Sequence, residues 1–336
     1  MSEFRPMVGH LLILVIFVEG PPGSTAALSE REKTDALLNV YRATGLLRRL
    51  SDTWGSQQVP PVKRLCGFTV LNRSVRVALD PGQLPVGGSF SDVDAKWLEA
   101  TTDILQLTGG SVFERVERLR QGLIGRTFLS LDVADAFPLF VTNYPCSKPG
   151  HAPNHRMVII PWTVVSATQT GNVDGVIAHE IGHVFGAPDE YGHCVTSQVA
   201  GFFDTANTNC ALVQRNPDIP NTGPRARCIM DQHAHALCPV TPIHWGWADA
   251  DHDGLPDLMA PATVQGATRS VTPGTTEIVN GRNVWDARAV LFGDEVVGGP
   301  FKINSPTSIE VSVPASASGT VTISLLTRAG MSTPAP

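Results

Sequence analysis

The sequence predicts an α+β domain followed by a small all-β domain. Up to about residue 190, hydrophobic residues recur with both helical and strand-like periods, so the first domain should contain both kinds of element. One helical segment, residues 179–183, carries a dense pattern of metal-ligating side chains. From about Ala262 onward, Thr, Val, Ser and Gly dominate and no helical pattern remains. We therefore expect the chemistry to lie in the first domain.

Composition excludes several classes of protein. The chain has 336 residues, of which 42% are hydrophobic and 17% are charged, a balance that suits folded domains. The formal net charge of −6 gives no electrostatic reason to expect a nucleic-acid partner. No apolar run reaches the roughly 18 residues that a membrane-spanning helix needs. We therefore expect neither nucleic-acid binding nor a stable membrane span.

Residues 1–27 contain the apolar run Leu11–Val18, which has two interpretations. A charged flank at Arg5 and small residues near Ala27 are typical of a signal peptide. The dominance of Ile and Val, followed by a Gly-Pro-Pro-Gly turn, is equally typical of a buried β-strand. The sequence alone leaves both interpretations open.

The next segments alternate between predicted helices and strands. Ser29 and Glu32 form a capping box, which predicts a helix to about Leu50. Ser91 with Asp94 resembles the start of a second helix. Further elements are expected at 68–78 (strand), 112–123 (helix), and 127–133, 138–142 and 156–161 (strands). A polar loop before the last strand holds His151 and His155, which we expect at the surface, with a place at the rim of the substrate cleft as the alternative.

The segment that follows has the pattern of a zinc-dependent hydrolase. His179 and His183 are four residues apart, so on a helix they project from one face and can bind one metal ion. Glu180 lies beside the first ligand, where it can act as a general base. Gly186 permits a sharp exit from the helix. Asp189 then comes six residues after His183, at the spacing of a third zinc ligand.

The third ligand has alternatives close by in the sequence. Glu190 and His193 both offer ligand atoms within a few residues of Asp189. A carboxylate oxygen is an accepted zinc ligand, and the spacing favours Asp189. We predict one catalytic Zn²⁺ held by His179, His183 and Asp189.

Six cysteines bear on the compartment in which the protein folds. They are Cys66, Cys146, Cys194, Cys210, Cys228 and Cys238. None forms a C-x-x-C pair, and an even number fits up to three disulfides in an oxidising environment. We therefore expect a secreted, extracellular protein, with the pairing left open.

A second metal signature follows the first domain. Asp249, Asp251, Asp253 and Asp257 surround a glycine at position 254, which matches the start of a calcium-binding loop. The twelfth position is Ala260, so the bidentate Glu of an EF-hand is missing. We predict a structural Ca²⁺ site in a linker at residues 249–261.

Residues 262–336 are predicted to form a β-sandwich. Ser308–Val313 and Thr320–Leu325 alternate strictly, and a turn at 314–319 predicts that they pair as a hairpin. A further strand is expected at Val284–Phe292. Nothing in this domain marks a ligand.

The order of these motifs resembles a known family. The D-E-Y ending at Asp189–Tyr191, the tripeptide Cys228-Ile229-Met230, Trp245-Gly246-Trp247 and the Asp249 loop occur together in one order. This order is similar to that of secreted bacterial zinc metallopeptidases of the metzincin-like kind, close in motif to the IgA-peptidase type. The resemblance implies a zincin fold for residues 28–248, endopeptidase activity and export.

The resemblance also implies roles for individual residues. It places ligand roles on His179, His183 and Asp189, and the base role on Glu180. Met230 would occupy the Met-turn, a tight turn whose methionine packs beneath the metal. Many members have a tyrosine just after this methionine, where this chain has Asp231 and Gln232. Tyr191 is the first candidate for the missing transition-state donor, and His233, His235 and His244 are the alternatives.

Two functions remain open at this point. The first is a zinc endopeptidase, expected to act as a monomer on a protein or peptide substrate. The alternative is a non-catalytic secreted protein that binds calcium and zinc and mediates adhesion or another interaction. The presence of Glu180 favours the enzyme, because a purely structural zinc site needs no base.

Overall fold

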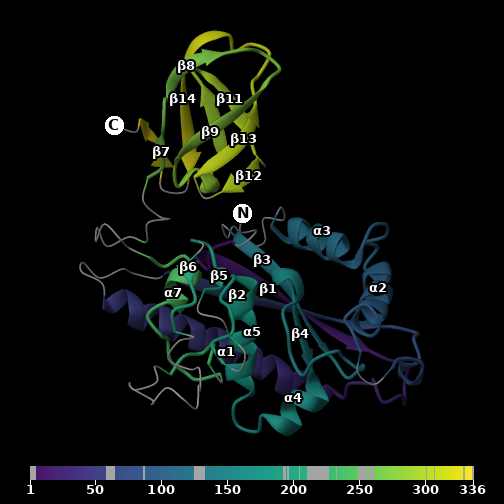
Figure 1. The fold of residues 1–336 in the computed structure, drawn as a ribbon. Coiled ribbons are helices and arrows are strands. Elements are labelled where there is room, and N and C mark those ends of the chain that lie inside the picture. The colour runs from purple at the N-terminus through teal and green to yellow at the C-terminus, as the bar shows by residue number, and fades with distance from the viewer. Residues whose placement is uncertain are drawn as a thin grey trace. The chain divides into compact units, whose positions relative to one another are not determined.

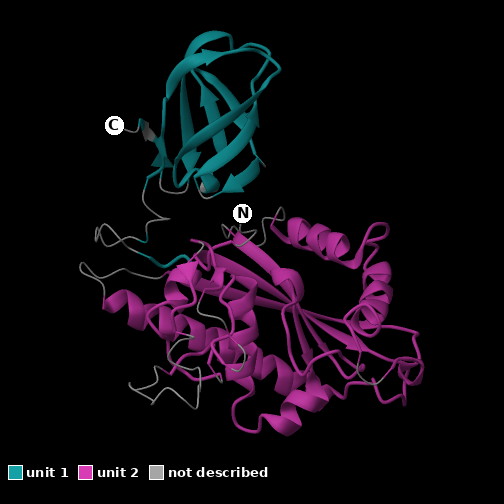
Figure 2. Ribbon diagram, viewed as in Figure 1, with its two compact units in different colours: residues 1–3, 58–62, 246–336 teal, residues 4–57, 63–245 magenta. Residues whose placement is uncertain are grey.

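A computed structural model of the chain describes most of its residues. The described residues are 5–57, 65–85, 88–124, 133–191, 194, 197–203, 205–209, 227–231, 233–248, 256, 261–299, 301–305, 307–327 and 330–334. They contain both helices and sheets, as the sequence predicts (Figure 1). The described chain divides into two compact units, one ending at Trp245 and one beginning at Gly246 (Figure 2).

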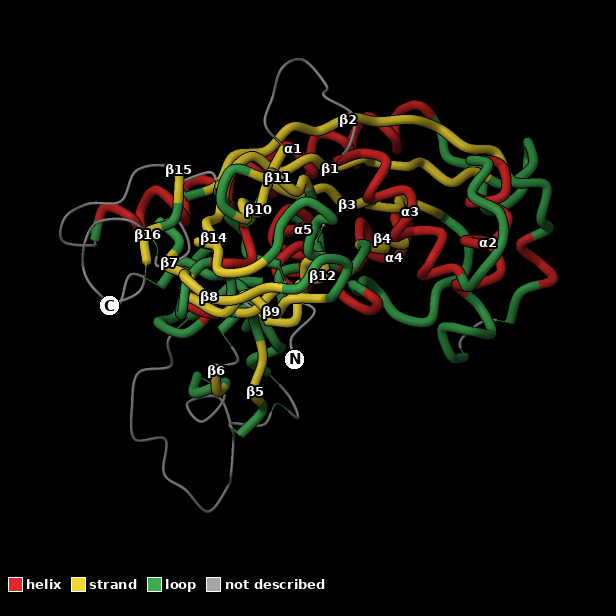
Figure 3. Tube along the Cα trace, turned by 90° about the horizontal axis from the view of Figure 1, so that it is seen from above, coloured by secondary structure: helices red, strands yellow, loops and turns green. Residues whose placement is uncertain are grey.

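The first unit is built on a four-stranded parallel sheet. Its strands run in the order β2-β1-β3-β4 and comprise β1 (Gly9–Glu19), β2 (Cys66–Arg76), β3 (Val133–Thr142) and β4 (Val158–Pro161). All three pairings are parallel. Viewed from above, β2, β1 and β3 lie side by side (Figure 3).

The apolar run near the N-terminus is a central strand of this sheet. Residues 11–18 are all at most 8% exposed, because β1 has a strand on each side and is covered on both faces. Strands buried on both faces read as continuous apolar runs, which explains the signal-like composition. Of the two interpretations, the structure has the strand, so this segment is part of the folded domain.

Helices cover both faces of the sheet. The α-helices of this unit are α1 (Glu30–Ser56), α2 (Asp94–Ile104), α3 (Val112–Ile124), α4 (Trp162–Thr168), α5 (Val173–Val184) and α7 (Thr241–His244). Short 3-10 helices are η1 (Pro81–Gln83) and η3 (Pro153–His155), and a small pair of strands is β5 (Val199–Ala200) with β6 (Thr205–Ala206). The predicted capping box at Ser29 and Glu32 is present. No helix among the described residues is long and apolar enough to cross a membrane.

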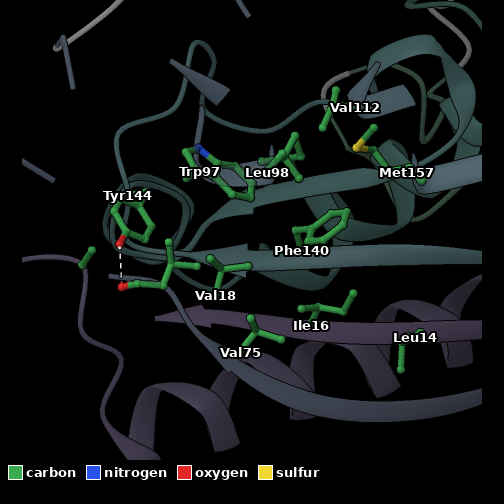
Figure 4. Packing of buried hydrophobic residues seen from close by; sticks show 14 of the residues in the cluster. Leu14, Ile16, Val18, Val75, Trp97, Leu98, Val112, Phe140, Tyr144 and Met157 are labelled. Carbon is green, nitrogen blue, oxygen red and sulfur yellow. Dashed lines mark hydrogen bonds between the residues drawn. The ribbon is translucent and has the colours of Figure 1, made fainter. Parts of the chain in front are cut away.

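One hydrophobic core joins α2 and α3 to the sheet. Trp97 of α2 packs edge-on against Phe140 of β3 and stacks on Tyr144, which follows β3 (Figure 4). The Tyr144 hydroxyl donates to the carbonyl of Leu79 at 2.7 Å. These contacts fix the start of the loop after β3, which goes on to form a wall of the candidate site.

The second predicted helix begins differently from its expected start. Ser91 does not cap it; the N-cap is Val93, which makes no side-chain cap hydrogen bond. Asp94 instead turns inward, is completely buried and accepts a hydrogen bond from the backbone N–H of Ser147 at 3.1 Å. The residue that the sequence pattern placed in a helix cap is therefore a buried carboxylate in the structure.

The second unit consists of two five-stranded sheets around one apolar core. The first sheet contains β8 (Thr268–Val271), β10 (Ala289–Phe292), β11 (Glu295–Gly298), β14 (Gly319–Thr327) and β15 (Gly330–Met331). The second contains β7 (Thr263–Val264), β9 (Thr276–Arg282), β12 (Lys302–Ser305), β13 (Ser308–Ser312) and β16 (Thr333–Pro334). A 3-10 helix, η4 (Val284–Asp286), precedes β10.

Two details of this unit differ from the sequence prediction. β13 and β14 do not form a hairpin, because β13 pairs with β9 and β12 whereas β14 belongs to the other sheet. The predicted strand Val284–Phe292 begins as η4 and becomes a strand only at Ala289. Strict alternation predicts that each strand has one buried face. It does not predict the partner strand, because a strand in either sheet can bury one face.

Candidate metal centre and cleft

Helix α5 presents the two histidines as the sequence predicts. His179 and His183 lie on one face of the helix, with ring centroids 4.6 Å apart. The helix ends at Val184, and Gly186 adopts a left-handed conformation with φ of 85°. The N–H of Ala187 then bonds back to the carbonyl of Gly182 at 3.2 Å, which reverses the chain. This reversal brings Asp189 back to the histidines.

Three ligand atoms converge at this point. The Nε2 atoms of His179 and His183 are 3.1 Å apart, and each is 3.2 Å from Oδ1 of Asp189. Two ligands on a tetrahedral zinc ion, at bond lengths of about 2.0–2.1 Å, lie roughly 3.3–3.4 Å apart. The triangle therefore has nearly the size of one face of a zinc tetrahedron.

The hydrogen bonds behind the histidines show why this triangle needs a positive charge. Nδ1 of His179 is 3.0 Å from the carbonyl of Ile229, and Nδ1 of His183 is 2.7 Å from the carbonyl of Ala187. A carbonyl can only accept, so each Nδ1 carries the proton and each neutral ring directs the lone pair of Nε2 at Asp189. Three electron-rich atoms then face one another. A divalent metal ion fits this set, and two imidazoles with a carboxylate suit zinc.

The pKa values in the site respond to the same crowding. Burial raises the pKa of Asp189, but the close approach of His179 and His183 outweighs burial and holds that pKa far below its usual value. Burial lowers the pKa of His183. The neighbouring carboxylates of Asp189 and Glu180 raise this pKa by more than burial lowers it, so the net shift is upward. The site thus attracts positive charge, which a bound metal or an added proton supplies.

Glu180 occupies a separate position beside the ligands. Its side chain is 6% exposed, and its Oε2 has no hydrogen-bond partner among the described residues. Burial is the largest influence on the pKa of Glu180 and raises it, although both histidines act in the opposite direction. A carboxylate with an open oxygen and a raised pKa is suited to accept a proton and return it.

The turn containing Met230 lies against the metal helix. The N–H of Asp231 bonds to the carbonyl of Cys228 at 2.9 Å, which closes the turn. Met230 is completely buried, and its carbonyl accepts from the N–H of Glu190 at 3.0 Å. A β-carbon placed on Gly182 would lie only 2.8 Å from the Met230 sulfur. The turn therefore supports both the helix and the chain that carries Asp189.

Glu190 is held away from the metal centre by its own hydrogen bonds. Its side chain is completely buried, and Oε1 accepts from the Thr241 hydroxyl at 2.8 Å and the Cys238 thiol at 3.0 Å. Oε2 accepts from the amide of Asn209 at 2.5 Å. Glu190 is thus excluded as the third ligand in this conformation. The other alternative, His193, lies outside the described residues.

A cavity of about 440 Å³ opens onto the candidate centre. The three candidate ligands, Glu180 and Tyr191 form part of its lining. The rest comes from two loops, residues 88–90 and residues 147–155. The cavity is large enough to admit part of a peptide, and it places Glu180 and the metal ligands on a shared surface.

Two histidines that we expected at the surface belong to this cavity. His151 and His155 both line it, and Nδ1 of His155 is 2.5 Å from the carbonyl of His183. Their loop returns to the sheet at β4, whose Ile159 pairs with His151 in antiparallel fashion. No local pattern marks these residues. The one available signal was the density of histidines just before the metal helix.

The candidate donors near Met230 occupy different places. Tyr191 lines the cavity, and its ring lies beside that of His179 with centroids 5.8 Å apart. His233 packs its ring edge against His179 with centroids 4.7 Å apart, and burial lowers its pKa to about 4. His235 bonds to Asn172, and His244 is fully buried against the carbonyl of Thr205.

Several predicted features lie beyond the described part of the chain or remain untested. The calcium ligands Asp249, Asp251, Asp253 and Asp257, like Gln232, are outside the described residues, so the Ca²⁺ site stays a prediction. Cys194 is disulfide-bonded, whereas Cys66, Cys146, Cys228 and Cys238 are free. Cys210 is outside the described residues.

Gly182 offers a stability test of this packing. We expect Gly182→Ala to lower the free energy of unfolding by about 1–3 kcal/mol, because the new methyl group overlaps the Met230 sulfur and the Trp245 ring. Urea unfolding at constant zinc concentration measures this change. Gly122→Ala in α3 is the matched control, since its β-carbon meets nothing within 4 Å and alanine favours the helix by about 0.5–1 kcal/mol. Equal stability changes in the two variants would contradict the packing.

Comparison with known proteins adds little to this description. No family model matches the chain, and no curated protein matches it. One solved structure is similar over a short stretch: a glycan-utilisation protein, SGBP-B of the mixed-linkage glucan utilization locus of Bacteroides ovatus, bound to a mixed-linkage heptasaccharide. The similarity has 19% identity, covers 22% of this chain and 23% of that chain, and has a TM-score of 0.19. Likeness at this level carries no argument about fold or function.

Proposed function

We propose that the protein is a secreted, zinc-dependent endopeptidase of metzincin-like architecture, with Glu180 as general base. The observation that carries this proposal is the convergence of His179, His183 and Asp189 within 3.2 Å of one another. Glu180 stands beside them in the same cavity. A structural site would have no use for a buried carboxylate with an open oxygen.

The zinc ion, when bound, supplies Lewis acidity toward a carbonyl oxygen and toward water. The residues of the chain supply the rest. Glu180 takes a proton from the attacking water as the water oxygen bonds to the scissile carbonyl carbon. Glu180 then returns this proton to the amide nitrogen as the carbon–nitrogen bond breaks, so an amine and a carboxylic acid leave. Tyr191, whose ring lies beside that of His179 with centroids 5.8 Å apart, helps to fix this ligand in place.

Two further observations support parts of the proposal. A buried methionine packed against the metal helix is what the metzincin-like resemblance predicts for Met230. The disulfide at Cys194 supports an oxidising compartment, because disulfides persist mainly outside the cytosol.

A peptide-library digest tests the proposal. We expect the zinc-loaded protein to cleave internal peptide bonds, and mass spectrometry of the products identifies them. We expect 1,10-phenanthroline to abolish cleavage, because it removes zinc in preference to calcium, and stoichiometric Zn²⁺ to restore it. A protein that holds one zinc ion per chain but cleaves no peptide would contradict the proposal and favour the non-catalytic alternative.

A further inference from the structure

Asp94 and His151 form a buried pair in the wall of the cavity. Asp94 at the start of α2 is completely buried, and the His151 side chain is 11% exposed. Nε2 of His151 is 3.8 Å from Oδ2 of Asp94. Burial outweighs the attraction of this carboxylate and lowers the pKa of His151, and the carboxylate restricts the orientation of the imidazole.

The pair has unused hydrogen-bonding capacity. Neither ring nitrogen of His151 has a partner among the described residues, and neither does Oδ1 of Asp94. Buried polar groups in folded proteins are nearly always hydrogen-bonded, so each exception calls for an explanation. His151 lines the same cavity as Glu180, but its two ring nitrogens are closed off from solvent in this conformation, so a molecule bound in that cavity meets them only after the side chain turns.

The position of His151 is fixed by the backbone. Its N–H donates to the carbonyl of Ile159 at 3.2 Å, and its carbonyl accepts from the N–H of Ile159 at 2.9 Å. The preceding residue, Gly150, passes so close to Glu180 that a β-carbon there would lie 3.3 Å from Oε1. His151 and Glu180 therefore border one space from two different elements.

Another histidine of the cavity wall is already engaged, because Nδ1 of His155 is 2.5 Å from the carbonyl of His183. His233 is not part of the cavity lining. Besides Asp94, the charged group that acts on the His151 ring is Lys148. Among the cavity histidines outside the candidate ligands, His151 is therefore the one whose ring nitrogens are both without a partner among the described residues.

We propose that His151 is a catalytic residue that donates a hydrogen bond to the scissile carbonyl oxygen as negative charge develops there, and that Asp94 is its positioning residue. This inference rests on the proposed peptidase function. A donor aimed at developing charge binds the transition state more tightly than the substrate, so it raises kcat. His151 would thereby take the role of transition-state donor, which the sequence left open between Tyr191 and the histidines after Met230.

Variants of His151 test the proposal with a peptide that the protein cleaves. His151→Phe keeps the ring but removes both nitrogens, and we expect kcat to fall about 10²–10³-fold, the usual effect of removing one oxyanion donor. KM and zinc content should change little. His151→Gln retains a donor, so we expect it to recover part of the lost kcat. Asp94→Asn should lower kcat less than His151→Phe does.

Two controls separate this role from a structural one. His235→Phe removes a histidine that is not part of the cavity lining and should leave kcat unchanged. A phosphinic peptide, which mimics the tetrahedral transition state, should bind His151→Phe more weakly in proportion to the loss of kcat/KM.

Different results would contradict the role of His151 and the peptidase function on which it rests. A folded, zinc-loaded His151→Phe variant with kcat within twofold of wild type would overturn the proposal. So would a loss of activity that parallels a loss of zinc or of thermal stability, because His151 would then act only on structure. If the wild-type protein cleaves no peptide, the proposed function itself fails.

Discussion

Glu180→Gln is expected to lower kcat for peptide cleavage by about 10²–10⁴-fold, the usual contribution of a general base. The amide has nearly the same shape as the carboxylate, but it cannot accept the proton of the attacking water. Zinc binding should persist, because the amide of Gln leaves the proposed ligands His179, His183 and Asp189 in place, although the Glu180 carboxylate lies within 4.8 Å of the histidine ligand atoms. Initial rates with a defined peptide, together with metal analysis, measure both quantities.

A carboxylate on the same helix provides the control for this variant. Asp174 is in the first turn of α5 and is not part of the cavity lining, so Asp174→Asn should retain wild-type kcat. Undiminished cleavage by Glu180→Gln would exclude Glu180 as the base. Loss of zinc along with activity would instead assign Glu180 to metal binding.

Asp189→Asn is expected to weaken zinc affinity by more than about 100-fold. Changes in residues that merely orient metal ligands cost about 10–100-fold, and loss of a charged ligand should exceed this. The variant also removes the charge that the two histidines face at 3.2 Å. Competition against a chromogenic chelator measures the affinity.

Glu190→Gln is the matched control, because Glu190 is adjacent in sequence but bonds to Thr241, Cys238 and Asn209. We expect this variant to lose stability, by about 1–3 kcal/mol for a disturbed buried network, and to keep its zinc affinity. The opposite pattern, with zinc lost from Glu190→Gln and retained by Asp189→Asn, would reassign the third ligand.

The sequence predicted the parts of the site that depend on local spacing. His179 and His183 share a helix face because four residues make about one turn, and Gly186 marks the reversal that returns Asp189. The position of Met230 downstream of this helix also predicted a contact with it. Met230 packs against Gly182, which lies between the two histidines of the motif. These relations need little knowledge of the tertiary fold.

The parts that depend on tertiary contacts were not predictable. Asp94 and His151 are 57 residues apart, and they meet because the fold brings the start of α2 against the loop before β4. The sequence pattern around Asp94 predicted a helix cap, and the polar loop around His151 predicted a surface residue. Similarly, the run 11–18 was ambiguous because burial on both faces of a sheet and a signal peptide select the same residue types.

Zinc K-edge X-ray absorption spectroscopy of the zinc-loaded protein tests the central claim most directly. The described residues hold a second cluster that could bind a metal, Glu190 with Cys228 and Cys238, so the identity of the ligands decides the account. We predict one zinc ion per chain with only nitrogen and oxygen neighbours at about 2.0–2.1 Å, two of them imidazoles. Sulfur neighbours at about 2.3 Å would place the metal at the cysteine cluster and contradict a centre built from His179, His183 and Asp189.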